Sequence, residues 1–145
     1  MIELERMETE SPEQTEELGG YLAERYPERR VVALLGPLGA GKTALTRGVA
    51  RRLGCLDRAS SPTYAIVNEY RGPRPVCHFD MYRIQDSDAL YDIGWEDYLE
   101  SGALCVVEWS ENILDALPPD TLFVKIEILS PSRRRITVTE GGAPC

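Results

Sequence analysis

The stretch Gly36-Pro37-Leu38-Gly39-Ala40-Gly41-Lys42-Thr43 decides the fold of this 145-residue chain. It matches the pattern G-x-x-x-x-G-K-[ST], in which glycines allow a tight backbone turn whose N–H groups point at phosphate oxygens. Lys42 supplies a full positive charge that can reach the β- and γ-phosphates, and the Thr43 hydroxyl is suited to ligate Mg²⁺. The stretch therefore predicts a phosphate-binding loop.

The residues on either side of this loop have the pattern that its chemistry requires. Val31-Val32-Ala33-Leu34-Leu35 is a short apolar run, typical of a strand buried on both faces. Residues 42–53 carry apolar side chains at helical spacing, and Gly54 then ends the segment as a helix C-cap does. A strand, a turn and a helix in direct succession would bring the positive end of the helix dipole to a bound anion, so we expect nucleotide binding.

The rest of the chain predicts a mixed sheet flanked by helices. Ser11-Pro12-Glu13-Gln14 has the form of a capping box and predicts a helix over residues 12–26, weakened by the pair Gly19-Gly20. Other patterns predict hairpin strands at 63–70 and 75–80, an acidic helical segment at 86–101 broken near Gly94, a buried strand at 103–108, a short helix at 110–117, and strands at 121–129 and 134–139. The expected fold class is α/β, a P-loop NTPase-like three-layer sandwich with parallel core strands, forming a single P-loop ATPase domain over residues 1–145.

Composition excludes several classes of protein. Hydrophobic residues make up 43% of the chain and charged residues 28%, as in a compact globular domain. The formal charge of −8 disfavours direct binding of RNA or DNA, which relies on basic surfaces. No apolar run is long enough to cross a bilayer, and the acidic N-terminus is unlike a secretory signal, so we expect a cytoplasmic protein. One histidine and four widely spaced cysteines favour reduced thiols over a zinc site.

Two acids at the ends of predicted strands are candidates for metal and water chemistry. Glu108 ends the most apolar strand and is the better candidate for the metal, and Asp80 is the candidate to position or deprotonate the attacking water. These two roles could be exchanged. The run Ser60-Ser61-Pro62-Thr63 is expected to form a loop, whose hydroxyls either sense the γ-phosphate or belong to an ordinary proline turn.

Two further features leave alternatives open. His78 and Asp80 share one face of a strand, which suggests a catalytic relay, but a structural role for the histidine is favoured. Residues 86–100 interleave acids with aromatic side chains, which is compatible with a docking face and equally with a solvated helix whose aromatics face the core.

Four strings together resemble the bacterial TsaE (YjeE) family: Gly36–Thr43, Ser61-Pro62-Thr63-Tyr64, His78-Phe79-Asp80-Met81-Tyr82-Arg83 and Glu108-Trp109-Ser110-Glu111. The resemblance covers roughly residues 11–138. It implies a cytoplasmic ATPase, weak alone, that binds ATP and Mg²⁺ and works with the TsaB–TsaD complex. That complex, and not this component, would transfer the threonylcarbamoyl group to the adenosine beside the anticodon in tRNAs that read codons starting with adenine. The resemblance implies contact with tRNA only through the complex, and no contact with DNA or a membrane.

The resemblance also assigns roles to residues. Lys42, Asp80, Thr63 and Glu108 would serve hydrolysis, Thr43 and Glu108 would hold Mg²⁺, and the nucleotide would be bound by Ser11, Thr15, Pro37, Leu38, Gly39, Ala40, Gly41, Lys42, Thr43, Trp109 and Arg134. Ser11 and Thr15 would approach the adenine, and Arg134 is chosen from the run Arg133-Arg134-Arg135. Pro37 departs from the pattern of many members, and because it has no backbone N–H it has none to donate to phosphate.

Two other functions compete with a partner-dependent ATPase. A stand-alone small-molecule kinase would use the same loop, but it normally needs a lid that supplies arginines, and no insertion of that size lies between Lys42 and Glu108. A nucleotide-gated scaffold would bind ATP without useful hydrolysis.

Overall fold

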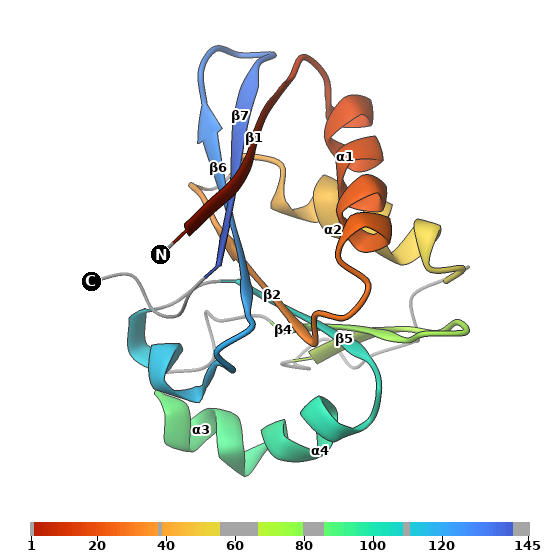
Figure 1. The fold of residues 1–145 in the computed structure, drawn as a ribbon, viewed down its shortest axis with the longest axis vertical. Coiled ribbons are helices and arrows are strands. Elements are labelled where there is room, and N and C mark those ends of the chain that lie inside the picture. Colours follow the sequence, from red (N-terminus) through yellow and green to blue (C-terminus); the bar gives the residue numbers. More distant parts are fainter. Residues whose placement is uncertain (1, 38, 56–66, 80–85, 109–110, 141–145) are drawn as a thin grey trace.

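The computed structural model describes residues 2–37, 39–55, 67–79, 86–108 and 111–140. Seven strands in these ranges form one sheet in the order β1-β7-β6-β2-β5-β4-β3 (Figure 1). The strands β6, β2, β5 and β4 are parallel neighbours, whereas β1, β7 and β3 pair antiparallel toward the edges. This confirms the expected mixed sheet with a parallel core. The strand bounds are β1 Ile2–Thr9, β2 Val31–Leu35, β3 Val67–Tyr70, β4 Val76–Phe79, β5 Leu104–Glu108, β6 Leu122–Ile128 and β7 Arg134–Glu140.

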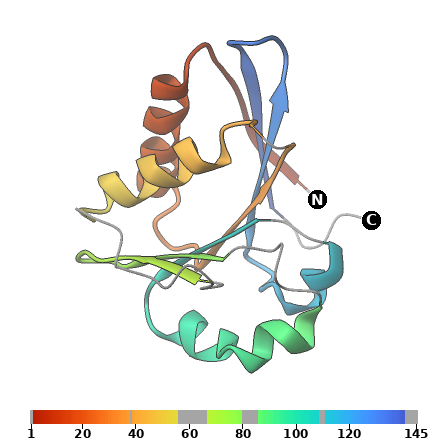
Figure 2. The ribbon, with the colours of Figure 1, turned by 180° about the vertical axis from the view of Figure 1, so that it is seen from behind.

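Helices cover both faces of the sheet. Helices α1 (Pro12–Arg25) and α2 (Lys42–Arg52) lie on one face, and α3 (Ser87–Asp92), α4 (Trp95–Glu100) and the 3₁₀ helix η2 (Glu111–Ala116) lie on the other (Figures 1 and 2). Along β5 the side chains alternate between the two layers, because Leu104 and Val106 join one core cluster while Cys105 and Val107 join the other. None of the helices in the described ranges is both long and apolar enough to cross a membrane.

The two helices on the first face approach each other closely at glycines. A Cβ atom on Gly19 of α1 would lie 2.1 Å from the Leu45 carbonyl oxygen of α2, and one on Gly48 of α2 would lie 1.7 Å from the Glu16 carbonyl oxygen of α1. The sequence pattern treats Gly19 only as a weak point of α1. The structure shows instead that Gly19 fixes how α1 packs on α2, the helix that begins at the phosphate-binding loop.

Strand β1 is absent from the sequence expectation, which begins its first element at Ser11. Four of the eight residues of β1 are charged, so its apolar alternation is weak. The strand forms because it pairs antiparallel with β7, and because Glu5 accepts hydrogen bonds of 2.5 Å from the hydroxyls of Tyr21 on α1 and of Tyr26, the residue that follows α1. Long-range pairing therefore decides this element, and β1 becomes an edge of the sheet.

The acidic segment after the hairpin forms two helices, with the predicted break at Gly94, whose φ is 91°. Trp95 is fully buried and its indole N–H donates to the Ala116 carbonyl at 2.9 Å, whereas Tyr91 remains 42% exposed. For Trp95, the structure therefore supports the alternative in which the aromatic side chains of this segment face the core. The short helix predicted near residues 110–117 is a 3₁₀ helix, with the Leu117 amide bonded to the Leu114 carbonyl three residues earlier.

The cysteines behave as small apolar residues. Cys55, Cys77 and Cys105 are buried free thiols, as the spacing predicts, and Cys145 lies outside the described residues. Burial raises the pKa of Cys77 to about 11 and that of Cys105 to about 12. Both thiols therefore remain protonated near neutral pH.

Candidate functional site

The phosphate-binding loop leaves the end of β2 and runs directly into α2. Gly39 and Gly41 have φ values of 80° and 117°, a conformation that L side chains rarely adopt, so both glycines are required here. The Ala40 amide donates to the Pro37 carbonyl at 3.1 Å, and the Leu45 amide donates to the Gly41 carbonyl at 2.9 Å in the first turn of α2. The loop therefore curls tightly into the start of the helix, as its sequence predicts.

Lys42 and Glu108 meet at the ends of adjacent parallel strands. Leu34 of β2 is in register with Glu108 of β5, so the acid emerges beside the loop that follows β2. The Lys42 ammonium lies 3.6 Å from Oε2 of Glu108, and the two side chains are 15% and 20% exposed. The sequence predicts Glu108 at a strand end, and the sheet order places it next to the loop lysine.

His78 of β4 lies on the other side of the same carboxylate. Its Nε2 atom is buried, makes no hydrogen bond to any described residue, and lies 3.6 Å from Oε1 of Glu108. The His78 imidazole, helped by the Lys42 ammonium, lowers the pKa of the Glu108 carboxyl against the raising effect of burial. The Glu108 carboxylate is consequently ionised at neutral pH and mostly buried.

A second group of predicted residues lines a pocket beside the loop. Ser11 is the N-cap of α1 and accepts a hydrogen bond from the Gln14 amide, and the Thr15 hydroxyl lies 2.8 Å from that of Thr9. Thr15 is close to the loop, since a Cβ on Gly41 would meet its methyl group at 3.3 Å. The pocket is lined by Ser11, Pro12, Thr15, Gly39, Ala40, Gly41, Pro131, Ser132 and Arg134.

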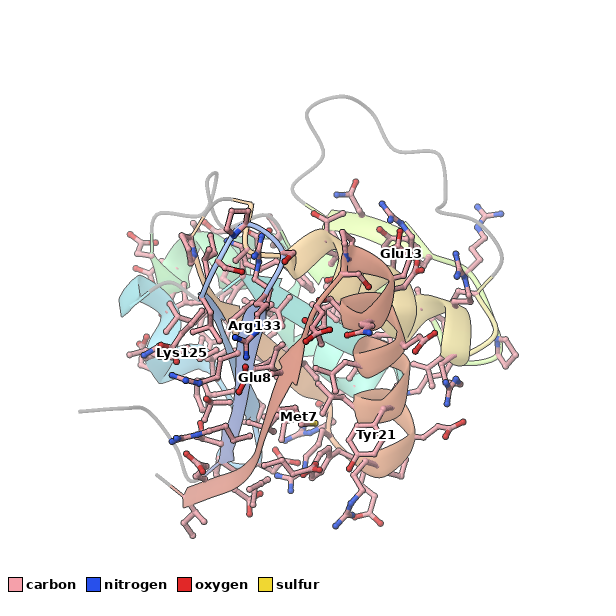
Figure 3. The ribbon with its side chains drawn as sticks, turned by 90° about the horizontal axis from the view of Figure 1, so that it is seen from above. Met7, Glu8, Glu13, Tyr21, Lys125 and Arg133 are labelled. Atoms are coloured by element: carbon pink, nitrogen blue, oxygen red, sulfur yellow. The ribbon has the colours of Figure 1, made fainter. Side chains whose placement is uncertain are left out.

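The structure separates the arginines that compete for one role in the sequence. Arg134 is the first residue of β7, and its guanidinium donates from Nε to the Ala40 carbonyl at 3.0 Å. Arg133 instead pairs with Glu8 of β1, and Figure 3 shows these two side chains together. Of these two, Arg134 alone lines the pocket beside the loop.

The described residues supply only part of the coordination shell that a magnesium ion needs. Thr43 is the second residue of α2 and is exposed, and Glu108 presents an ionised carboxylate near the same helix end. Mg²⁺ prefers oxygen ligands and is usually held by one or two protein groups together with substrate phosphates and water. Thr43 and Glu108 match that chemistry.

Several predicted site residues lie outside the described residues. They are Leu38 of the loop, Ser61, Pro62 and Thr63 of the candidate switch segment, Asp80, and Trp109. Their expected roles are neither confirmed nor contradicted by the structure.

Sequence reasoning missed some of what surrounds the loop. The run Ser130-Pro131-Ser132 is typical of a turn, but nothing local indicates that it borders the pocket, because that depends on β6 lying next to β2 and β7 next to β6. The pairing of His78 with Glu108 was also missed, since the sequence pattern relates His78 only to Asp80. The parallel register of β4 with β5 brings His78 opposite Val106, two residues before Glu108.

Comparisons with known proteins agree with one another. The family model described as "Threonylcarbamoyl adenosine biosynthesis protein TsaE" matches residues 9–136. Proteins named tRNA threonylcarbamoyladenosine biosynthesis protein TsaE are similar to this chain. The one from Treponema pallidum is 32% identical over 133 residues, covering 92% of this chain and 98% of that protein. The one from Bacillus subtilis is 36% identical over 135 residues, covering 92% and 84%.

A solved structure supports the same conclusion. The crystal structure of Bacillus subtilis YdiB superimposes with a TM-score of 0.77 at 31% sequence identity, covering 98% of this chain and 88% of that one. Together, the match to the family model, the similar proteins and the shared fold show that this chain belongs to the TsaE family, which acts in the threonylcarbamoyladenosine modification of tRNA.

Proposed function

We propose that this chain is a Mg²⁺-dependent ATPase, weak alone, that works in the cytoplasm with the TsaB–TsaD complex during formation of threonylcarbamoyladenosine. It is not itself the transferase. The observation that carries the proposal is the meeting of Lys42 and Glu108, at 3.6 Å, at the mouth of a phosphate-binding loop. Phosphoryl chemistry on a P-loop requires a cation that contacts phosphate and an acid that holds the metal, close together beside the parallel strands. Lys42 and Glu108 have this arrangement.

The described residues divide the work of holding a nucleotide. Backbone amides of the loop and the N-terminus of α2 face the phosphates, and Lys42 exchanges its contact with Glu108 for phosphate oxygens. Thr43 and Glu108 would hold Mg²⁺. The ion would supply positive charge that neutralises the phosphates. Ser11 and Thr15 line the pocket next to the loop and would accommodate the adenine.

The remaining roles are assigned to residues outside the described ranges. Asp80 would position the attacking water, and Thr63 in the segment Ser61-Pro62-Thr63 would respond to the γ-phosphate. Trp109 follows Glu108 in the sequence and would lie beside the nucleotide. The net charge of −8 supports contact with tRNA through partner proteins rather than directly.

Phosphate release from ATP tests the proposal when it is measured with and without purified TsaB and TsaD. Release that rises with the partners supports a partner-dependent ATPase. Transfer of label to a small acceptor would instead indicate a kinase. No release under any condition, together with tight ATP binding, would indicate a nucleotide-gated scaffold.

A further inference from the structure

Arg134 joins the phosphate-binding loop to the turn between β6 and β7. From one side of its guanidinium, Nε donates to the Ala40 carbonyl at 3.0 Å and Nη2 to the Gly39 carbonyl at 3.4 Å. From the other side, Nη1 donates to the Ser130 and Arg133 carbonyls at 2.8 and 3.0 Å and lies 3.4 Å from that of Pro131. One side chain thus connects two segments that are more than ninety residues apart in the sequence.

The turn that holds Arg134 is itself well anchored. The Leu129 amide donates to the Arg133 carbonyl at 3.0 Å, and the Arg133 amide donates to the Ser130 hydroxyl at 3.1 Å. The hairpin ladder of β6 and β7 continues from this turn into the core of the sheet. Arg134 therefore attaches the loop to backbone carbonyls of a hydrogen-bonded turn and not to another side chain.

The contact with the Ala40 carbonyl has a consequence for the loop amides. In a trans peptide the carbonyl and the following amide point in opposite directions. Because Arg134 holds the Ala40 carbonyl, the Gly41 amide points away from the guanidinium. An unrestrained peptide would be free to turn the carbonyl oxygen, a partial negative charge, toward a bound anion, and the strong charge-assisted contact with Arg134 opposes this rotation.

The guanidinium also has little donor capacity left for a ligand. It carries five N–H donors, and the distances above commit Nε and Nη1 fully to protein carbonyls and Nη2 in part. This distribution differs from a side chain whose main contact is the base or ribose of a nucleotide, in which several donors would remain unpaired and directed into the pocket.

We infer that Arg134 is a positioning residue: by holding the Gly39 and Ala40 carbonyls, it keeps the loop in the conformation in which the Gly41 amide is oriented for a polyphosphate. The inference deepens the proposed function and rests on it. It predicts that replacing Arg134 lowers the affinity for a polyphosphate whether or not the ligand carries a base. It also predicts that the orientation of the loop depends on Arg134 when no ligand is added.

Calorimetry with two probes tests the first prediction. Mg²⁺-ATP and Mg²⁺-tripolyphosphate, which has no nucleoside, are titrated into the wild type, Arg134→Gln, Arg134→Lys and the control Arg133→Gln. We expect Arg134→Gln to weaken both probes by about tenfold or more, as loss of charge-assisted hydrogen bonds implies. Arg134→Lys should be intermediate, because an ammonium cannot span two carbonyls as a planar fork does. Arg133→Gln should match the wild type, because Arg133 pairs with Glu8 at the surface.

Loss of ATP binding with unchanged tripolyphosphate binding in Arg134→Gln would overturn the inference, because it would make Arg134 a nucleoside contact. Unchanged binding of both probes would overturn it as well. If the wild type binds neither ATP nor tripolyphosphate, the proposed function is refuted instead.

Hydrogen exchange of the Ala40 amide, which donates to the Pro37 carbonyl, decides the inference in every case when it is measured without added ligand. Exchange that is about tenfold faster in Arg134→Gln, but not in Arg133→Gln, supports it. Equal exchange in all variants would refute it, and thermal unfolding of each variant separates a local effect from loss of the fold.

Discussion

Nζ of Lys42 lies 3.6 Å from Oε2 of Glu108, so the loop cation and the candidate metal ligand share one mostly buried position at the ends of β2 and β5. The ammonium acts on the acid, because together with the His78 imidazole it lowers the pKa of the Glu108 carboxyl. A polyphosphate that contacts Lys42 replaces one anionic partner by another. The contributions of Lys42 and Glu108 therefore have to be measured separately.

Replacement of Lys42 by alanine should abolish or strongly weaken nucleotide binding. The variant removes the only full positive charge of the loop itself, and we expect ATP affinity to fall by at least about tenfold by calorimetry. Lys125→Ala is the matched control, since Lys125 is the other lysine of the chain and lies exposed on β6 (Figure 3). Equal affinities of the wild type and Lys42→Ala would remove Lys42 from its proposed role.

Replacement of Glu108 by glutamine should change the response to Mg²⁺ more than the affinity for nucleotide. The amide keeps the shape of the side chain but loses the charge that a divalent cation prefers. We expect the Mg²⁺ concentration needed for half-maximal phosphate release to rise several-fold, while ADP binding without metal changes little. Glu100→Gln, at an exposed position of α4, serves as the control. An unaltered Mg²⁺ titration in Glu108→Gln would transfer the metal role to Asp80.

Gly19 and Gly20 are neighbours in α1 that should respond in opposite ways to alanine. In Gly19→Ala the new methyl group meets the Leu45 backbone, which has no rotamer by which to yield, so we expect a loss of about 1–3 kcal/mol or more in the free energy of unfolding. In Gly20→Ala the nearest atoms belong to the flexible Arg52 side chain, and helix propensity favours alanine by about 1 kcal/mol.

Urea unfolding of the two glycine variants checks this difference. Because α2 begins at the phosphate-binding loop, Gly19→Ala should also reduce ATP affinity while Gly20→Ala leaves it unchanged. Equal stabilities of the two variants would show that α1 and α2 can separate slightly at no cost. The close approach at Gly19 would then have no energetic role.

Sequence alone predicts the parts of the site that are determined by residues close together in the sequence. The loop Gly36–Thr43 combines backbone conformation, charge and helix start within eight residues, so its pattern is sufficient. Strands β2 and β5 are predictable as well, because burial on both faces requires a continuous apolar run in each. Glu108 follows from its place at the end of such a run.

The parts that sequence does not predict depend on which strands become neighbours. β1 forms through its pairing with β7, at the other end of the described chain, and its own residues alternate too weakly to show it. Arg134 reaches the loop because β7 and β6 lie on the same side of β2, so only family resemblance, and no local pattern, selects it from three adjacent arginines. His78 contacts Glu108 for the same reason, through β4 and β5.

The buried thiols of Cys77 and Cys105 should make the fold sensitive to alkaline pH. Burial raises the pKa of Cys77 to about 11 and that of Cys105 to about 12, above the ordinary value of 9.0. In the unfolded chain these thiols ionise near pH 9, while in the folded protein they keep their protons. The stabilisation from these two thiols is therefore complete below pH 9. It decreases as pH rises above 9 and is fully lost once pH has passed 11 for Cys77 and 12 for Cys105.

Replacement of Cys105 by valine tests this dependence, because valine is apolar and cannot ionise. Urea unfolding at pH 8, 9 and 10 should show a smaller decline in the free energy of unfolding for Cys105→Val than for the wild type, whatever the stabilities at pH 8. Tyrosines with raised pKa values, such as Tyr26, contribute to the decline in both proteins, so the difference between the two declines reports the loss of the Cys105 thiol. Parallel declines would mean that the Cys105 thiol ionises as easily in the folded protein as in the unfolded chain, which its complete burial between the sheet and the α4 layer opposes.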